Sequence, residues 1–138
     1  MTVLKVAVLT TATVLAHAVV VLLHAWAHLV LGVNMSPFQI VFIVLVIMLA
    51  PIVAAVLMWT PYRRAGALIF AVSMFGALVF GAFHHFLDPG IDNISKVPTD
   101  DWGALFRLTA VLLAIIEGWG SIVGWWSIRL IPRANVQA

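Results

Sequence analysis

The sequence predicts an all-α integral membrane protein: one domain, residues 1–138, folded as a bundle of four transmembrane helices. Composition is the first reason, because 64% of the 138 residues are hydrophobic and only 9% are charged. A soluble domain carries about 25% charged residues. The second reason is length, because the chain contains four apolar runs and a span needs about 20 residues. A separate soluble domain is therefore excluded, and with a formal net charge of only +2 we expect no nucleic-acid partner.

The first two spans are predicted at residues 3–33 and 37–59. The sequence Ala16-His17-Ala18 resembles a signal-peptide cleavage site, but the apolar run continues to Val33. We therefore expect a retained span that crosses the membrane with tilt. Pro37 suits the first turn of the second helix, and Pro51 is expected to kink it.

The third and fourth spans are predicted at residues 65–87 and 102–131. Between them, the outer segment 88–101, helical or loop, holds four of the five acidic residues. Asp100 and Asp101 fit the N-terminal cap of the fourth helix. Small residues predict close helix packing, including a match to GxxxG at 120–124.

Charge placement predicts the orientation. In a four-span chain the basic residues Lys5, Arg63, Arg64, Arg129 and Arg133 fall on one side, and Lys96 with the acidic loop falls on the other. By the positive-inside rule both termini are cytoplasmic. We therefore expect a multi-pass protein of the cell (cytoplasmic or inner) membrane.

Histidines are the unusual feature of these spans, because ionisable residues inside a membrane usually mark a functional site. His17, His24 and His28 share one face of the first helix, at about 100° per residue. At 1.5 Å per residue, His24 and His28 lie about 13 and 7 Å below the outer end. His84 and His85 lie near the end of the third span, within about 5 Å of its outer end.

The outer histidines have the chemistry of a transition-metal site. His24 and His28 form an H-x-x-x-H pair that can chelate one ion, and His84 or His85 can add a third imidazole. These two point about 100° apart, so at most one of them faces the pair. Asp88 or Asp92 is expected as a further ligand or as an acceptor behind a ligand. With no cysteine in the chain, copper, iron or zinc bound by nitrogen and oxygen is predicted.

Four further residues complete the candidate site. Glu117, the one carboxylate predicted mid-membrane, matches His17 in depth, as a structural pair, a proton relay or a ligand from below. Arg107 is expected to hold the acidic loop by pairing with its aspartates. Trp26 lies between His24 and His28 and is expected either to wall the site or to pack in the core.

The predicted function is that of a small membrane subunit with a histidine-rich metal site near the outer face. It would belong to a larger metalloenzyme or electron-transfer complex, with lipid and either partner subunits or further copies of itself as neighbours. A b-type cytochrome subunit is one alternative, with heme b between His28 and His84 or His85. A metal-free structural or assembly subunit, whose histidines bind only headgroups or carbonyls, is the other. No Ser/His/Asp or HExxH arrangement indicates a hydrolase, and whether any reaction is catalysed stays open.

Overall fold

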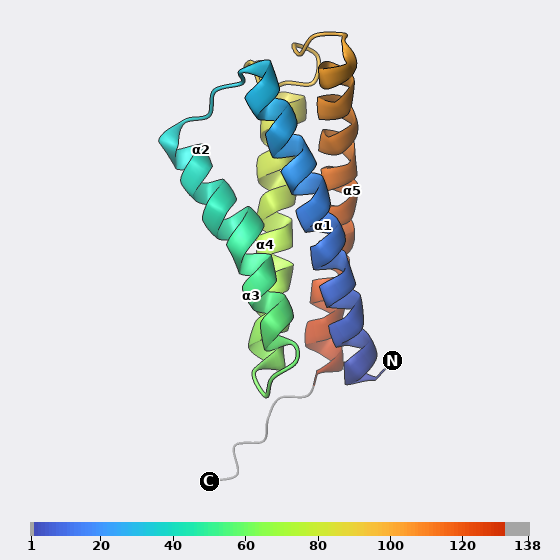
Figure 1. The fold of residues 1–138 in the computed structure, drawn as a ribbon. Coiled ribbons are helices and arrows are strands. Elements are labelled where there is room, and N and C mark those ends of the chain that lie inside the picture. Colours follow the sequence, from blue (N-terminus) through green and yellow to red (C-terminus); the bar gives the residue numbers. More distant parts are fainter. Residues whose placement is uncertain (1, 132–138) are drawn as a thin grey trace.

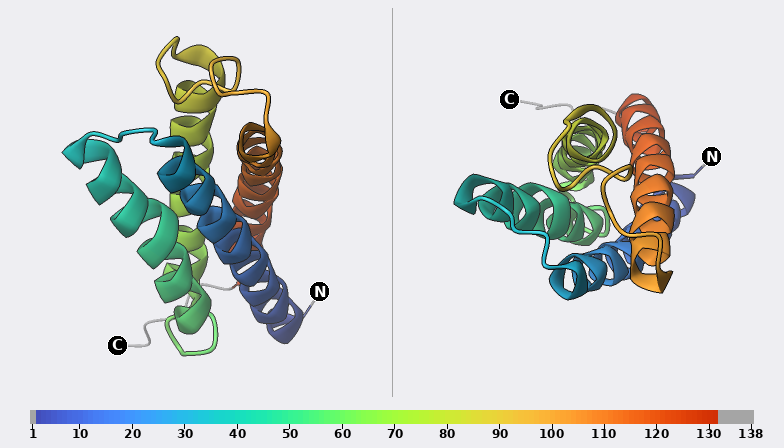
Figure 2. Two further views of the ribbon diagram at one scale, coloured as in Figure 1. Left: turned by 45° about the horizontal axis from the view of Figure 1, so that its top comes forward. Right: turned by 90° about the horizontal axis from the view of Figure 1, so that it is seen from above.

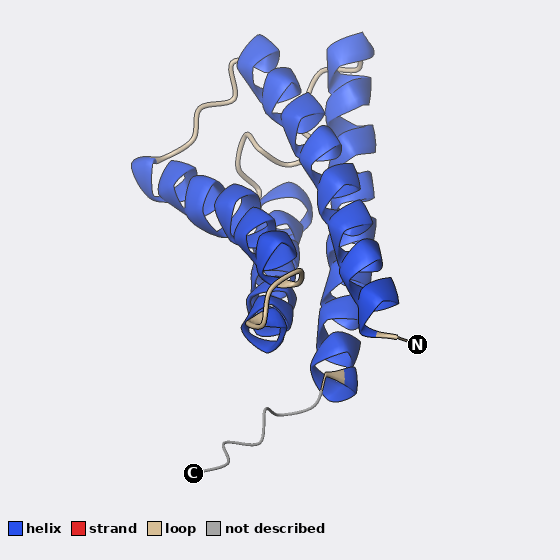
Figure 3. Cartoon of the chain, turned by 60° about the horizontal axis from the view of Figure 1, so that its bottom comes forward, coloured by secondary structure: helices blue, strands red, loops and turns tan. Residues whose placement is uncertain are grey.

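The computed structural model describes residues 2–131, and every regular element in them is helical (Figure 3). The elements are α1 (Val3–Leu31), α2 (Pro37–Phe42), η1 (Ile43–Leu49), α3 (Ala50–Leu57), α4 (Arg63–Ala82), η2 (Phe83–Leu87) and α5 (Asp101–Leu130). They join into four helices long and apolar enough to cross a membrane: Val3–Leu31, Pro37–Leu57, Arg63–Leu87 and Asp101–Leu130. The prediction of an all-helical chain with four helices of membrane-spanning length and composition is confirmed.

The helix ends lie within two residues of the predicted boundaries, and local chemistry accounts for them. Gly32 adopts a left-handed conformation (φ 63°) and its N–H bonds to the carbonyls of His28 and Leu29, which ends α1. At the start of α5, the Asp100 carboxylate accepts a hydrogen bond of 2.8 Å from the N–H of Gly103.

The bundle is built around α4 and α5, with α1 packed along α5 and α3 packed along α4 (Figure 1). The N-terminal end of α1 and the C-terminal end of α5 lie together at one end of the bundle. By contrast, α2 leans away from the other helices (Figure 2) and buries no residue. The described chain is therefore a tight bundle at one end and splayed at the other.

Glycines allow the close approach of these helices. A Cβ atom on Gly124 would lie 2.7 Å from the backbone of Ala71, and one on Gly120 would lie 2.6 Å from the Met74 side chain. The GxxxG match therefore packs α5 against α4 within one chain. Phe70 and Met74, two of the largest fully buried side chains, pack in the cluster that includes Val123 of α5.

Two π-helical turns interrupt the spans. In η1 the N–H of Ala50 donates to the carbonyl of Leu45, five residues back, directly before Pro51. This wide turn is the local form of the disturbance expected from proline. In η2 the N–H of Asp88 donates to the carbonyl of Phe83 at 2.7 Å. The second wide turn carries His84 and His85, and such turns are frequent at functional sites.

The outside of the bundle is apolar and its charges lie at the ends. Exposed large hydrophobic residues occur on every span, which is consistent with lipid contact. Lys5, Arg63, Arg64 and Arg129 lie at the end that holds the N-terminus. Arg133, which was predicted to join them, lies outside the described residues.

Candidate metal centre

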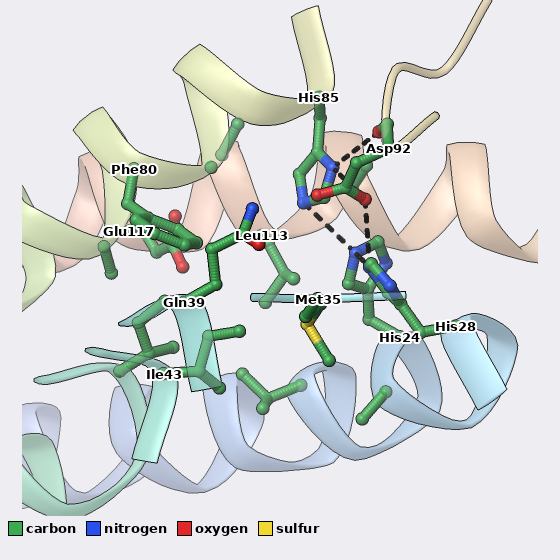
Figure 4. Close-up of a pocket in the computed structure, with 17 residues that line it drawn as sticks. His24, His28, Met35, Gln39, Ile43, Phe80, His85, Asp92, Leu113 and Glu117 are labelled. Atoms are coloured by element: carbon green, nitrogen blue, oxygen red, sulfur yellow. Dashed lines mark hydrogen bonds and ion pairs between the residues drawn. The ribbon is translucent and has the colours of Figure 1, made fainter. Parts of the chain in front are cut away.

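Three buried histidines meet near the splayed end of the bundle (Figure 4). His24 and His28 come from successive turns of α1, and His85 comes from η2. The Nε2 atom of His24 lies 3.2 Å from Nε2 of His85 and 3.2 Å from Nε2 of His28. A ligand atom from each ring lies within 4.8 Å of the other two. The i,i+4 pair of α1 thus acquires a third imidazole from the α4 span.

His84 does not join this cluster. Its Nδ1 atom lies 3.4 Å from the side-chain nitrogen of Gln39 in α2 and 3.7 Å from a carboxylate oxygen of Asp88. The wide turn of η2 carries both histidines, and only His85 points between α1 and α5. Of the two adjacent residues proposed as ligands, the structure brings His85 alone to His24 and His28.

Asp92 is the carboxylate at the cluster. Its Oδ1 atom lies 3.2 Å from Nε2 of His28 and 3.3 Å from Nδ1 of His85, while its backbone carbonyl accepts from Nδ1 of His85 at 3.1 Å. The Oδ1 contacts are at ion-pair distance without the angles of a hydrogen bond, so this buried oxygen has no hydrogen-bond partner in the described residues. Asp88 instead lies on the far side, beside His84.

Backbone hydrogen bonds hold the acidic loop over the cluster. The carbonyl of His85 accepts from the N–H of Ile94 at 3.0 Å, and the Asn93 side chain donates to the carbonyl of Asp88 at 2.8 Å. Arg107 anchors the loop through the carbonyl of Val97 at 3.2 Å rather than through an aspartate. The predicted ion pair does not form in the described residues.

The aspartates expected to pair with Arg107 have other positions. Asp92 faces the histidines, Asp88 lies beside His84, and Asp100 caps α5. The fourth, Asp101, opens the first turn of α5 and is exposed. The Arg107 guanidinium therefore donates to a backbone carbonyl of the loop, that of Val97, and not to an aspartate.

Thr109 of α5 is a part of the site that the sequence analysis missed. Its Oγ1 atom lies 2.8 Å from Nδ1 of His24, and its hydroxyl also faces the helix carbonyls of Leu105 and Phe106 at 2.8 and 3.0 Å. Carbonyls only accept, so they take the single hydroxyl hydrogen, and Oγ1 accepts from Nδ1–H of His24. The signal in the sequence was depth: Thr109 lies about 12 Å from the outer end of its helix, level with His24.

The hydrogen-bond partner of His85 likewise determines which of its ring nitrogens carries the hydrogen. Its Nδ1 atom faces the carbonyl of Asp92, which can only accept, so Nδ1 carries the hydrogen. In neutral rings the Nε2 atoms of His24 and His85 then both present lone pairs, 3.2 Å apart. Two such lone pairs repel unless a cation lies between them.

The nitrogen spacing fits a metal ion. Two nitrogens bound to zinc at about 2.0–2.1 Å and a tetrahedral angle lie about 3.3–3.4 Å apart. The two Nε2–Nε2 distances of 3.2 Å are close to that value. Two of the three rings also have the backing group typical of a metal ligand, because Nδ1 of His24 donates to a hydroxyl and Nδ1 of His85 donates to a carbonyl. Nδ1 of His28 has no hydrogen-bond partner in the described residues.

The same packing is unfavourable for heme b. An axial pair from His28 and His85, whose ring centroids are 6.0 Å apart, would need the macrocycle between them. His24 lies in that space, with its centroid 4.8 Å from each ring. Phe106, fully buried, packs against all three imidazoles with centroids 4.7–5.5 Å away.

Trp26 lies outside the site. Its side chain is 57% exposed and points away from the bundle, so it neither walls the cluster nor packs in the core. Residue 26 is two positions from both His24 and His28, which places it about 200° around the helix from each.

A second polar contact joins α1 to α5 deeper in the bundle. Nε2 of His17 lies 3.2 Å from Oε1 of Glu117, and both residues are almost fully buried. This is the partner that depth alone suggested for Glu117. Glu117 makes no hydrogen bond to His24, His28 or His85 in the described residues.

Comparisons of the chain with protein-family models, with curated proteins and with solved structures gave no match. The arguments for function therefore come from the geometry of the site.

Proposed function

We propose that this protein is a small multi-pass membrane subunit that binds one transition-metal ion through the Nε2 atoms of His24, His28 and His85. The observation that carries the proposal is the convergence of these atoms, two of them lone-pair donors 3.2 Å apart. Asp92 supports the site from the loop, as the acceptor behind His85 and a neighbour of His28. A donor set of imidazoles with a nearby carboxylate suits copper(II), iron or zinc.

The orientation we propose places the metal centre at the outer membrane face, with both termini cytoplasmic. The support is the basic end of the bundle, with Lys5, Arg63, Arg64 and Arg129, opposite the acidic loop. We also propose that the subunit works within a larger membrane metalloenzyme or electron-transfer complex. The support is α2, which buries no residue in this chain and so leaves a helix face for a neighbouring subunit.

The test is elemental analysis together with an optical spectrum, on protein purified in mild detergent without chelators. We expect about one copper, iron or zinc per chain, because the three nitrogens form one site, and no Soret band. The double variant His24→Ala/His28→Ala should lose the metal. His84→Ala, a change of the same residue type beside the site, should keep it.

Other outcomes would replace the proposal. A Soret band that disappears in His28→Ala would establish the cytochrome alternative. Absence of both metal and chromophore, with the double variant indistinguishable from the parent protein, would leave a metal-free scaffold subunit.

A further inference from the structure

The histidine cluster borders a partly open cavity of about 80 Å³ (Figure 4). His24, His28, His85 and Asp92 line one end of it, and Glu117 lines the other. At roughly 30 Å³ per water molecule in the liquid, the volume fits two or three waters. It is far smaller than the several hundred Å³ of a pocket for a large organic cofactor.

Glu117 presents a free oxygen to this cavity. Its Oε1 atom bonds to His17, whereas Oε2 makes no hydrogen bond in the described residues although the residue is only 3% exposed. Unlike Oδ1 of Asp92, Oε2 is not fully enclosed by protein atoms, and Glu117 lines the cavity, so a small molecule there can donate a hydrogen bond to it.

Gly81 leaves the space open between the metal centre and Glu117. A Cβ atom built on this glycine would lie 3.8 Å from Cδ2 of His85 and 3.7 Å from Oε2 of Glu117. Both are ordinary contact distances, so a Cβ atom at this position fits without moving its neighbours. Its outer atoms would fill the gap between the two groups.

Three protein ligands leave one position of a tetrahedral ion unfilled. Asp92 approaches the cluster from the loop, with Oδ1 3.2 Å from Nε2 of His28 and 3.3 Å from Nδ1 of His85. Among the described residues, it is not part of the group whose ligand atoms all lie within 4.8 Å of one another, which contains His24, His28 and His85 alone. The cavity borders all three imidazoles, and small or apolar side chains such as Ala77, Ala110 and Leu113 form its walls. An additional ligand of the metal would therefore lie in the cavity, with Glu117 as the acceptor facing it.

We propose that this cavity is a chamber for a small exchangeable ligand of the metal. The ligand class is a compact oxygen or nitrogen donor that carries its own hydrogen, with water as the simplest member. One end binds the metal and the hydrogen-bearing end donates, directly or through a second water, to Oε2 of Glu117. The proposal rests on the metal site proposed above. It gives that site three protein ligands and one exchangeable position, as in catalytic metal sites, whereas structural sites have four protein ligands.

The experiment loads the purified protein with copper(II), exchanges it into D₂O, and measures deuterium coupling to the copper by pulsed electron paramagnetic resonance. We expect the coupling of a directly bound exchangeable ligand in the parent protein. Gly81→Val should reduce it to the level of solvent outside the first coordination shell, with copper content unchanged. Ala114→Leu, on another wall of the cavity, serves as a second filling variant if Gly81→Val does not fold.

Gly118→Val is the matched control, because a Cβ there would meet only the end of the Leu78 side chain at 4.0 Å and Gly118 does not line the cavity. It should retain the deuterium coupling. Stoichiometric copper without a bound exchangeable ligand would overturn the chamber and leave the metal site intact. Equal coupling in the parent protein and the filling variants would also overturn it, whereas failure of the parent protein to hold copper would count against the metal site itself.

Discussion

The outer cluster and the inner His17–Glu117 pair are built from the same kinds of group, imidazoles and a carboxylate. They differ in how well their hydrogen-bond donors and acceptors match. Each joins an imidazole of α1 to groups from other segments at 3.2 Å. The inner site has one imidazole and one carboxylate, which can share one hydrogen. The outer site has three imidazoles and Asp92, and leaves Nδ1 of His28 and Oδ1 of Asp92 without hydrogen-bond partners in the described residues.

This difference separates a contact that holds two helices together from a cluster that could hold a metal ion. At the inner pair a single hydrogen can lie between Nε2 of His17 and Oε1 of Glu117, so this contact holds α1 against α5 without any added ion. At the outer cluster, the acceptors behind His24 and His85 hold the ring hydrogens on the Nδ1 atoms, so the two Nε2 atoms face one another as acceptors without a donor between them. A cation removes that conflict, and the cost of burying these groups unpaired becomes binding free energy.

The largest expected effect comes from removing one partner of the inner His17–Glu117 pair. Glu117→Ala leaves Nε2 of His17 without its partner and should lower the free energy of unfolding by about 1–3 kcal/mol. His17→Ala should do the same for Glu117. Metal content should stay at the parental level, because neither residue touches the cluster. The measurement is unfolding of the detergent-solubilised variants by a denaturing detergent, followed by circular dichroism.

The double variant His17→Leu/Glu117→Leu is the control for this prediction. Since it removes both polar partners, its loss of stability should be clearly smaller than the sum of the single losses. Additive losses would mean that the two side chains do not interact. Loss of metal in Glu117→Ala would show instead that this carboxylate takes part in the metal site, either as a ligand or as the acceptor of the metal's additional ligand.

An intermediate effect is expected from Asp92→Asn. The change keeps the size of the side chain but removes the negative charge beside His28 and His85. Groups behind metal ligands typically contribute 10- to 100-fold in affinity, so we expect metal binding weaker by about tenfold or more. Competition with a chelator of known affinity measures it.

Asp88→Asn supplies the comparison for this second prediction, because Asp88 lies beside His84 and outside the cluster. Its affinity for metal should match that of the parent protein. Equal weakening by the two variants would mean that the overall charge of the loop acts on the metal, and not the position of Asp92.

The smallest effect is expected from Thr109→Val. The hydroxyl orients His24 but does not face the other histidines, so its loss should weaken metal binding by only a few-fold, less than Asp92→Asn. Thr109→Ser keeps the hydroxyl and should restore the affinity. If Thr109→Val binds metal as tightly as the parent protein while His24→Ala does not, the threonine is not needed to orient the ring.

Much of this architecture could be predicted from the sequence because a membrane limits the choices. Long apolar runs without charges have to be helices, and a fixed rise per residue gives the depth of each polar group. That reasoning was enough to pair His17 with Glu117. It was also enough to place His24 and His28 on one face toward the third span.

The remaining details depend on geometry that helical periodicity does not contain. His84 and His85 are adjacent, and the π-helical turn in which they lie was not predicted. The choice of Asp92 over Asp88 follows from the path of an irregular loop. Thr109 was missed because an isolated threonine in a helix usually bonds its own backbone, as this one also does.

The unequal lengths of the four spans have a consequence for how the protein sits in a bilayer. At 1.5 Å per residue, Val3–Leu31 and Asp101–Leu130 are each about 45 Å long, whereas the hydrocarbon layer is about 30 Å thick. These two helices must tilt or project into the headgroup layer, while Pro37–Leu57 just matches the layer. His28 lies only three residues from the end of α1, so bilayer thickness sets how far an ion must travel from water to the cluster. A thicker membrane would seal the site, and a thinner one would lift it into the headgroups.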